Sequence, residues 1–288
     1  MRSYWFAATG STLLGDLGRL GNASLPAVAG LIGLLVGLGY KAALVPLHFW
    51  APDAYDGAPV SVAAYLSIVP KVGALFGLAQ VARGLPESAA DWRLVLALMA
   101  AASMTYGNVT ALVQSNVVRL LAYSSIAQAG YLLLGVVAVS HSALALPSLI
   151  VFGAAYAAMN LGAFAIVARV GRPLEAFAGF GRTSRWGGIV LVVCLLSLVG
   201  LPPLAGFAGK LLLFGAGIDA GYTWLAVVAI LNSVLSLGVY LRLIVPMYQE
   251  PPAARQRVGA GAVAFISLAL TVGLGIGADL IVRGAHAA

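Results

Sequence analysis

Long apolar runs separated by short polar connectors dominate the chain. Each run is about 20 residues or longer, which is enough to cross roughly 30 Å of hydrocarbon as a helix. The runs do not show the alternation expected of membrane-barrel strands. The pattern predicts an all-α membrane protein with eight spans, at about 25–49, 59–83, 92–113, 117–139, 144–168, 186–217, 222–248 and 259–282. Because the connectors are short, we expect neighbouring helices to run antiparallel in one bundle.

Two of these runs contain helix breakers at depth. Pro46 interrupts the first, within residues 41–48, and Pro202 and Pro203 interrupt the sixth, within residues 200–210. Proline removes a helical donor, and in lipid the freed backbone groups must be satisfied inside the protein. Paired interrupted helices with an ionisable residue nearby indicate an ion pathway in transporters. A kink with only a packing role is the alternative for either run alone.

Composition agrees with a membrane protein. The 288 residues are 61% hydrophobic and 9% charged, whereas a soluble domain carries about 25% charged residues. The net charge of +7 does not indicate nucleic-acid binding, because the arginines occupy short connectors and not one basic face with interleaved aromatics.

Arginine placement predicts the orientation, since cytoplasmic connectors carry the excess of basic residues. One side collects Arg119, Arg169, Arg172, Arg182, Arg185, Arg255 and Arg257, with Arg242 nearby, and the other collects Arg2, Arg19, Arg83, Arg93 and Arg283. The first side is therefore expected to be cytoplasmic, with both termini on the outer side of a bacterial inner membrane.

The only three lysines, Lys41, Lys71 and Lys210, all fall within apolar runs, whereas the thirteen arginines fall at or near their ends. Lys71 lies about 12 residues from either end of its span, which is roughly 18 Å along a helix. Its side chain extends only roughly 6 Å and cannot snorkel to the interface. Lysine can release its proton when buried, whereas arginine stays protonated. We therefore interpret the lysines as parts of a proton path.

Other polar residues could extend this path. Ser124, Gln128 and Tyr131 share one helix face, and Ser67 lies one turn from Lys71. Interhelical hydrogen bonding without transport is the alternative for such stripes. His48 follows the first break and is a candidate proton relay, or a histidine satisfied at the interface. Asp53 and Asp56 are expected in the connector between the first two spans, and no acidic residue is expected at mid-membrane, so a counter-charge has to come from elsewhere.

Cofactor chemistry is not visible in the sequence. Gly209-Lys210 is not a P-loop, because Leu204 and Leu211 occupy the motif positions that need glycine and serine or threonine. Cys194 is the only cysteine and is expected to be a small core residue. Metal-ligand spacing of histidine and cysteine is also not seen.

Three segments resemble a known family. Residues 39–59 (GYKAALVPLHFWAPDAYDGAP), 119–131 (RLLAYSSIAQAGY) and 196–210 (LSLVGLPPLAGFAGK) are similar to signatures of the antiporter-like subunits of respiratory complex I. Within this family, the N-type subunits are the most similar. The amino-acid sequences of residues 55–59 and 67–71, together with a lysine at position 210, resemble theirs. The resemblance covers nearly the whole chain.

The resemblance implies a proton-translocating, non-redox subunit of NADH:quinone oxidoreductase. Lys41 and Lys210 would match the lysines of the two broken helices, Lys71 the central lysine, and His48 the histidine after the first break. NADH, flavin, iron–sulfur clusters and quinone would be bound by other subunits, and the partners would be other membrane subunits and lipid. Gln128 stands where the family often has histidine, and glutamine cannot titrate.

By this resemblance the chain is expected to be N-terminally truncated. Residues 1–24 would be a stub, 25–90 the remainder of a first antiporter-like repeat, 91–250 a second repeat, and 251–288 a C-terminal helix. The glutamate that the family pairs with Lys41 would then be missing. A subunit of a cation/proton antiporter, a related membrane-bound hydrogenase and a purely structural subunit are the alternative interpretations.

Overall fold

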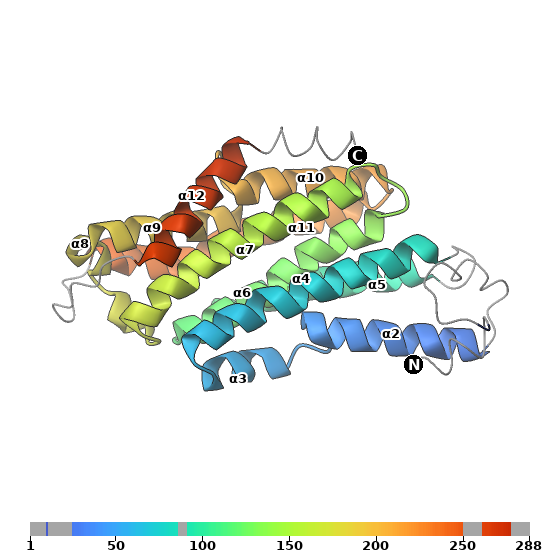
Figure 1. The fold of residues 1–288 in the computed structure, drawn as a ribbon, viewed down its shortest axis with the longest axis horizontal. Helices are drawn as coiled ribbons and strands as arrows, with labels where there is room; N and C mark the ends of the chain where they lie inside the picture. Colours follow the sequence, from blue (N-terminus) through green and yellow to red (C-terminus); the bar gives the residue numbers. More distant parts are fainter. Residues whose placement is uncertain (1–9, 11–24, 86–90, 250–260, 278–288) are drawn as a thin grey trace.

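The computed structural model describes residues 10, 25–85, 91–249 and 261–277, which fold as an elongated bundle of helices (Figure 1). The helices are α2 (Leu25–Ala42), α3 (Trp50–Gly57), α4 (Val60–Gly84), α5 (Trp92–Ala111), α6 (Val117–Ala138), α7 (Ala145–Val170), η3 (Leu174–Phe177), α8 (Phe180–Thr183), α9 (Arg185–Val199), α10 (Ala205–Asp219), α11 (Thr223–Gln249) and α12 (Ala262–Ile276). No strand occurs in these ranges, so the predicted all-α class is confirmed there.

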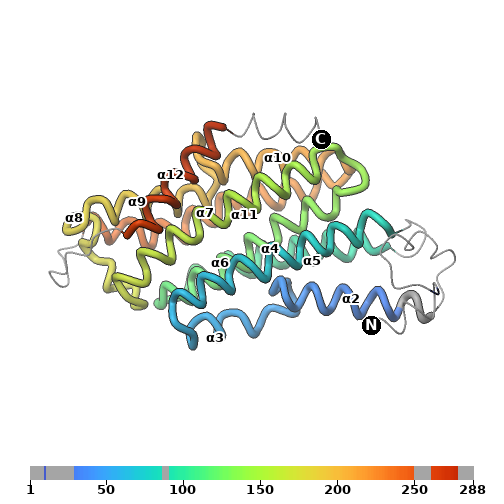
Figure 2. The backbone as a smooth tube through the Cα atoms, in the orientation of Figure 1, coloured from blue at the N-terminus to red at the C-terminus, as the bar shows by residue number. Residues whose placement is uncertain are grey.

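The helices match the predicted spans closely. Five of them, α4, α5, α6, α7 and α11, are long and apolar enough to cross a membrane. The sixth predicted span is divided into α9 and α10, as the two adjacent prolines predict. The backbone trace shows α3 continuing beyond α2, so this pair forms the first broken span (Figure 2).

The first broken span is longer than predicted. We expected it to end near residue 49 and expected Asp53 and Asp56 to lie in a connector. The chain instead turns after α2 and begins a second half-helix at Trp50, which ends at Gly57. Pro59 explains this end, because proline disfavours helical geometry in the residue before it. Both carboxylates therefore belong to the broken helix.

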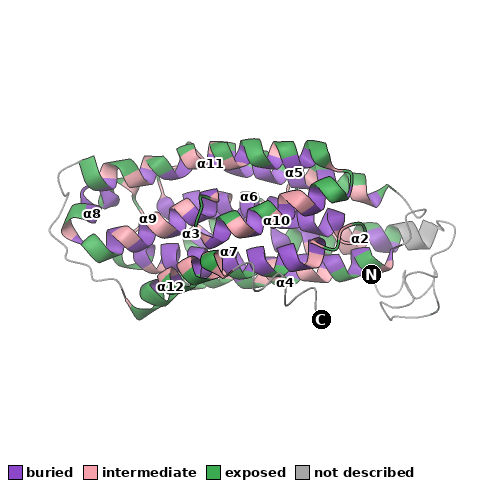
Figure 3. Cartoon of the chain, turned by 90° about the horizontal axis from the view of Figure 1, so that it is seen from above, coloured by how far each residue is buried: buried purple, intermediate pink, exposed green. Residues whose placement is uncertain are grey.

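Helix α6 is the centre of the bundle. In an apolar stretch of 18 residues of α6, 94% of the residues are buried, whereas the share in the corresponding stretch of α11 is 39%. It packs against α3, α4, α5, α7 and α10. Viewed from above, buried residues concentrate in the inner helices, and exposed residues follow the outer sides of α5 and α11 (Figure 3). The side chains of α6 can therefore meet those of several spans at once.

Some predictions fall outside the described residues. The expected N-terminal stub lies there apart from Gly10. Five of the arginines used to assign orientation lie there as well: Arg2, Arg19, Arg255, Arg257 and Arg283. The orientation, the sidedness of the termini and the division into two repeats therefore stay predictions.

Candidate functional site

Lys71 lies in the middle of α4 and is completely buried. Its Nζ donates a hydrogen bond to Ser125 Oγ of α6 at 2.6 Å. The Nζ also lies 5.7 Å from the centre of the Tyr55 ring, which comes from α3. Among the described contacts, a hydroxyl and an aromatic face therefore take the place that a carboxylate partner would have.

A proline next to Lys71 explains why Tyr55 lies there. Pro70 has no backbone N–H, so it cannot donate to the carbonyl of Leu66 one turn earlier. The Tyr55 hydroxyl donates to Leu66 O at 3.0 Å. One residue further along, the Tyr156 hydroxyl donates to Ser67 O at 2.9 Å. Two tyrosines, from α3 and α7, therefore donate hydrogen bonds to the carbonyls of α4 near Pro70 and stabilise the helix around Lys71.

Lys210 lies at the second break and is almost fully buried. Its Nζ donates to the carbonyls of Leu198 and Val199, both at 3.0 Å, and to Ser233 Oγ at 3.2 Å. The Nζ also lies 4.0 Å from the centre of the Tyr131 ring. The carbonyls are the last of helix α9, where the helix dipole carries partial negative charge. The end of a half-helix thus stabilises the ammonium in place of an acidic side chain.

Two glycines make this arrangement possible. Gly200 ends α9 with φ +95°, in the left-handed region that favours glycine. Gly206 begins α10 so close to α9 that an added Cβ would lie 1.7 Å from Ser197 O. The two half-helices therefore touch backbone to backbone, and this contact holds Lys210 at the carbonyl end of α9.

The predicted polar stripe of α6 faces inward. Ser124 Oγ lies 2.5 Å from the Tyr240 hydroxyl of α11, and Gln128 Nε2 donates to Leu198 O at 3.1 Å. Tyr131 accepts a hydrogen bond from Ser233 at 3.2 Å. Gln128 thus shares one carbonyl with Lys210, so the stripe runs from the neighbourhood of Lys71 to the second break.

Ser67 lies one turn before Lys71, as predicted, but has other partners. Its Oγ donates to Ala64 O and accepts from Asn160 Nδ2. Its role within the described contacts is to join α4 to α7, and it does not contact the lysine directly.

A cavity of about 260 Å³ adjoins Lys210 between α10 and α11. Its lining is apolar except for the side chains of Lys210 and Ser233. Its apolar lining includes the exposed side chains of Leu211, Ile230 and Val234, so this space opens on the outside of the described bundle.

Among the described residues, neither Lys41 nor His48 forms a hydrogen bond with Lys71 or Lys210, although His48 lies close enough to Lys71 for their charges to interact. Lys41 lies in the last turn of α2 with its side chain exposed, and no described residue bonds to it. His48 packs edge-on against Tyr106, with ring centres 4.6 Å apart. A continuous helix would have placed both on one face, but the break at Pro46 separates them.

Sequence reasoning did not single out Tyr55, Ser125 and Ser233, which contact the buried lysines. Pro70 was a usable signal for the first, because a proline inside a span predicts that some side chain must satisfy the freed carbonyl. The serines have no such signal, since their pairing depends on how α6 and α11 rotate in the bundle.

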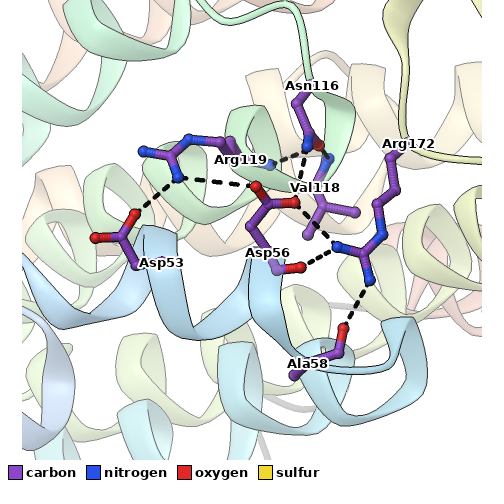
Figure 4. A network of polar contacts seen from close by, with 7 residues as sticks. All are labelled: Asp53, Asp56, Ala58, Asn116, Val118, Arg119 and Arg172. Carbon is purple, nitrogen blue, oxygen red and sulfur yellow. Dashed lines mark hydrogen bonds and ion pairs between the residues drawn. The ribbon is translucent and has the colours of Figure 1, made fainter.

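Acidic partners are not part of this arrangement. Within the described ranges, neither Lys71 nor Lys210 contacts a carboxylate, and no group of three or more metal-ligating side chains occurs there. The carboxylates Asp53 and Asp56 pair instead with Arg119 and Arg172 at one end of the bundle (Figure 4).

Two broken helices, each beside a central span, and lysines buried against the polar face of the central helix α6 define a membrane subunit of the antiporter type. The sequence profile of the family described as "NADH:quinone oxidoreductase/Mrp antiporter, TM" matches residues 2–236. The chain therefore belongs to this family.

Individual relatives support this family assignment. The chain is 41% identical over 268 residues to NADH-quinone oxidoreductase subunit N 1 of Streptomyces griseus, covering 89% of this chain and 56% of that protein. It is also 41% identical over 250 residues to NADH-quinone oxidoreductase subunit N of Mycobacterium sp. strain JLS, covering 85% and 53%. The chain thus spans about half the length of the curated relatives it matches.

Solved structures show the same fold. A chain of respiratory complex I from Thermus thermophilus superposes with a TM-score of 0.85 at 36% identity, covering 98% of this chain and 64% of that chain. A chain of the Mrp complex from Dietzia superposes with a TM-score of 0.84 at 24% identity, covering 98% and 62%. At that identity the second likeness shows the fold alone.

Proposed function

We propose that this chain is the proton-translocating membrane subunit, of the N type, of an NADH:quinone oxidoreductase. The observation that supports this most is the pair of buried lysines, Lys71 and Lys210, each held by neutral groups and joined by the polar face of α6. The similarity to N-type subunits at about 40% identity supports the assignment to that complex and not to an antiporter.

In this proposal each lysine holds one proton at Nζ. Protonated Lys71 donates to Ser125, and protonated Lys210 donates to the carbonyls that end α9. Both sites lack a permanent counter-charge among the described residues, so small changes in helix position decide whether the proton stays. Moving α10 away from α9 removes the carbonyls from Lys210 and favours release of its proton.

The chain itself would do no redox chemistry. NADH, flavin, iron–sulfur clusters and quinone would be bound by other subunits, and their reaction would drive the helix movements. The partners would be neighbouring membrane subunits of the complex and the lipid of a bacterial inner membrane, with both termini on the outer side. Lys41 and His48 would take part in the same proton path at the first broken helix.

The test is proton pumping by the assembled complex in membrane vesicles. We expect Lys71→Met and Lys210→Met each to lower NADH-driven proton pumping and quinone-linked NADH oxidation together. Thr271→Val is the matched control, because its hydroxyl is buried in α12, donates to Ser267 O of its own helix and forms no described hydrogen bond with either lysine. The amount of assembled complex is measured in parallel.

Unchanged pumping in an assembled complex that carries either lysine variant would overturn the proposal. Loss of sodium-driven proton exchange with intact quinone-linked NADH oxidation would instead assign the chain to a cation/proton antiporter.

A further inference from the structure

A cluster of three polar side chains fixes the short half-helix α3 at one end of the bundle (Figure 4). The carboxylate of Asp56 accepts from Arg172 Nη1 at 3.0 Å and from Asn116 Nδ2 at 2.8 Å. Arg172 lies in the connector after α7, and Asn116 is the N-cap of α6. We call Asp56, Arg172 and Asn116 the α3 clamp; it joins three segments that are far apart in the sequence.

The clamp also satisfies the backbone at the end of α3. Arg172 donates through Nη1 to Asp56 O and through Nη2 to Ala58 O, the latter at 2.9 Å. A cation at a helix C-terminus interacts favourably with the helix dipole and with the unpaired carbonyls. Helix α3 has only eight residues, and isolated helices of that length are not stable in water. Its position therefore depends on contacts such as these.

Asp53 provides a contrast on the same helix. Its side chain is 76% exposed and pairs with Arg119 at 2.7 Å, whereas the Asp56 side chain is 30% exposed and Arg172 is 36% exposed. Exposed ion pairs are strongly screened by solvent and contribute little to stability. Arg119 also lies 3.8 Å from the other carboxylate oxygen of Asp56, beyond hydrogen-bond distance (Figure 4). The inner pair, with its carbonyl contacts, therefore fixes α3 more firmly than either contact of Arg119.

What the clamp positions is the residue next to Asp56. Tyr55 is completely buried, its ring faces Lys71, and its hydroxyl bonds to the carbonyl that Pro70 leaves free. A displacement of Asp56 moves the Tyr55 backbone with it, since they are neighbours on one rigid turn. The ring contact with Lys71 then changes although Lys71 lies on another helix.

We infer that the α3 clamp is a positioning device for proton transfer, which acts on Lys71 through Tyr55. This inference rests on the proposed function. In it, Asp56 and Arg172 never hold the transported proton; they set the distance between the aromatic face and the lysine. The position of Arg172 in the connector after α7 thereby affects the contact between Tyr55 and Lys71 of α4.

The test compares variants of the assembled complex by NADH-driven proton pumping, with assembly measured separately. We expect Asp56→Asn to lower pumping roughly two- to fivefold, the range that a partly exposed ion pair spans. Asp53→Asn, the matched control on the same helix, is expected to pump as the unaltered complex does. Asp56→Glu, which keeps the charge, is expected to restore most of the loss.

A double-mutant cycle separates positioning from general loss of structure. In a Tyr55→Leu background the ring is gone, so Asp56→Asn is expected to cause no further loss of pumping. Arg172→Lys is a second variant, used if Asp56→Asn fails to assemble. It keeps the ion pair with Asp56 but cannot also reach Ala58 O. Its loss of pumping is expected to be smaller than that of Asp56→Asn and to disappear in the Tyr55→Leu background.

Pumping by Asp56→Asn or Arg172→Lys equal to that of Asp53→Asn would overturn the inference. Equal fold losses with and without Tyr55 would overturn it as well, because the clamp would then act by another route. Loss in Lys71→Met with no effect of the clamp variants would remove only this inference, whereas no loss in Lys71→Met would remove the proposed function.

Discussion

The contact between the two halves of the second broken helix gives the sharpest prediction. Replacing Gly206 by alanine would place a Cβ 1.7 Å from Ser197 O and 2.7 Å from the carbonyl carbon of Ser197. Ordinary van der Waals contact begins at about 3.4 Å. Both sides of this contact are backbone, so no side chain can rotate away, and α10 has to move from α9 by about 1.7 Å.

The size of the effect follows from the hydrogen bonds of Lys210. Its Nζ lies 3.0 Å from both terminal carbonyls of α9, and Lys210 is carried by the helix that moves. A shift of more than about 1 Å takes both contacts beyond hydrogen-bond distance. Hydrogen bonds to charged groups contribute about 1.5–3 kcal/mol each, so Gly206→Ala is expected to cost about 3 kcal/mol. If half of that falls on the protonated lysine, pumping slows about tenfold.

Thermal unfolding of the purified assembly and NADH-driven pumping in vesicles measure the two effects. Gly215→Ala is the matched control in the same helix, since its Cβ would only touch Leu144 Cδ1 at 3.4 Å. Alanine is favoured over glycine in helices by about 0.5–1 kcal/mol, so this control is expected to be neutral or slightly stabilising. A Gly206→Ala complex that unfolds and pumps like the Gly215→Ala complex would refute the close contact of α9 and α10.

Two further predictions concern capping groups. Tyr55→Phe leaves Leu66 O without its donor and should lower the free energy of unfolding by about 1 kcal/mol. Pro70→Ala supplies a backbone N–H to that carbonyl, so Tyr55→Phe should cost almost nothing in a Pro70→Ala background. Equal costs in both backgrounds would contradict this account. Asn116→Ala removes both the N-cap of α6 and the hydrogen bond to Asp56, and should cost about 2 kcal/mol in thermal unfolding. Asn116→Ser, which keeps a capping oxygen, should recover about half of that loss, and an alanine variant as stable as the unaltered protein would argue against both contacts.

The amino-acid sequence by itself determined the class of fold and the positions of most spans. Runs of apolar residues long enough to cross a bilayer leave helices as the consistent solution, because lipid offers no partners for unpaired backbone groups. The same reasoning placed the breaks at Pro46 and Pro202, although a proline by itself does not decide a break, because α4 continues through Pro70. It also placed Lys71 at mid-span.

The tertiary structure decided what each polar group meets. The sequence showed a lysine at 210 but not that the ammonium would bond to the end of α9, because that contact depends on the turn between the half-helices. It placed Asp56 in a connector, whereas packing against α6 and the connector after α7 keeps this residue helical. Spacing along one helix is local and can be read in sequence; the meeting of side chains from α3, α4 and α6 depends on helix rotation and register, which only the folded bundle fixes.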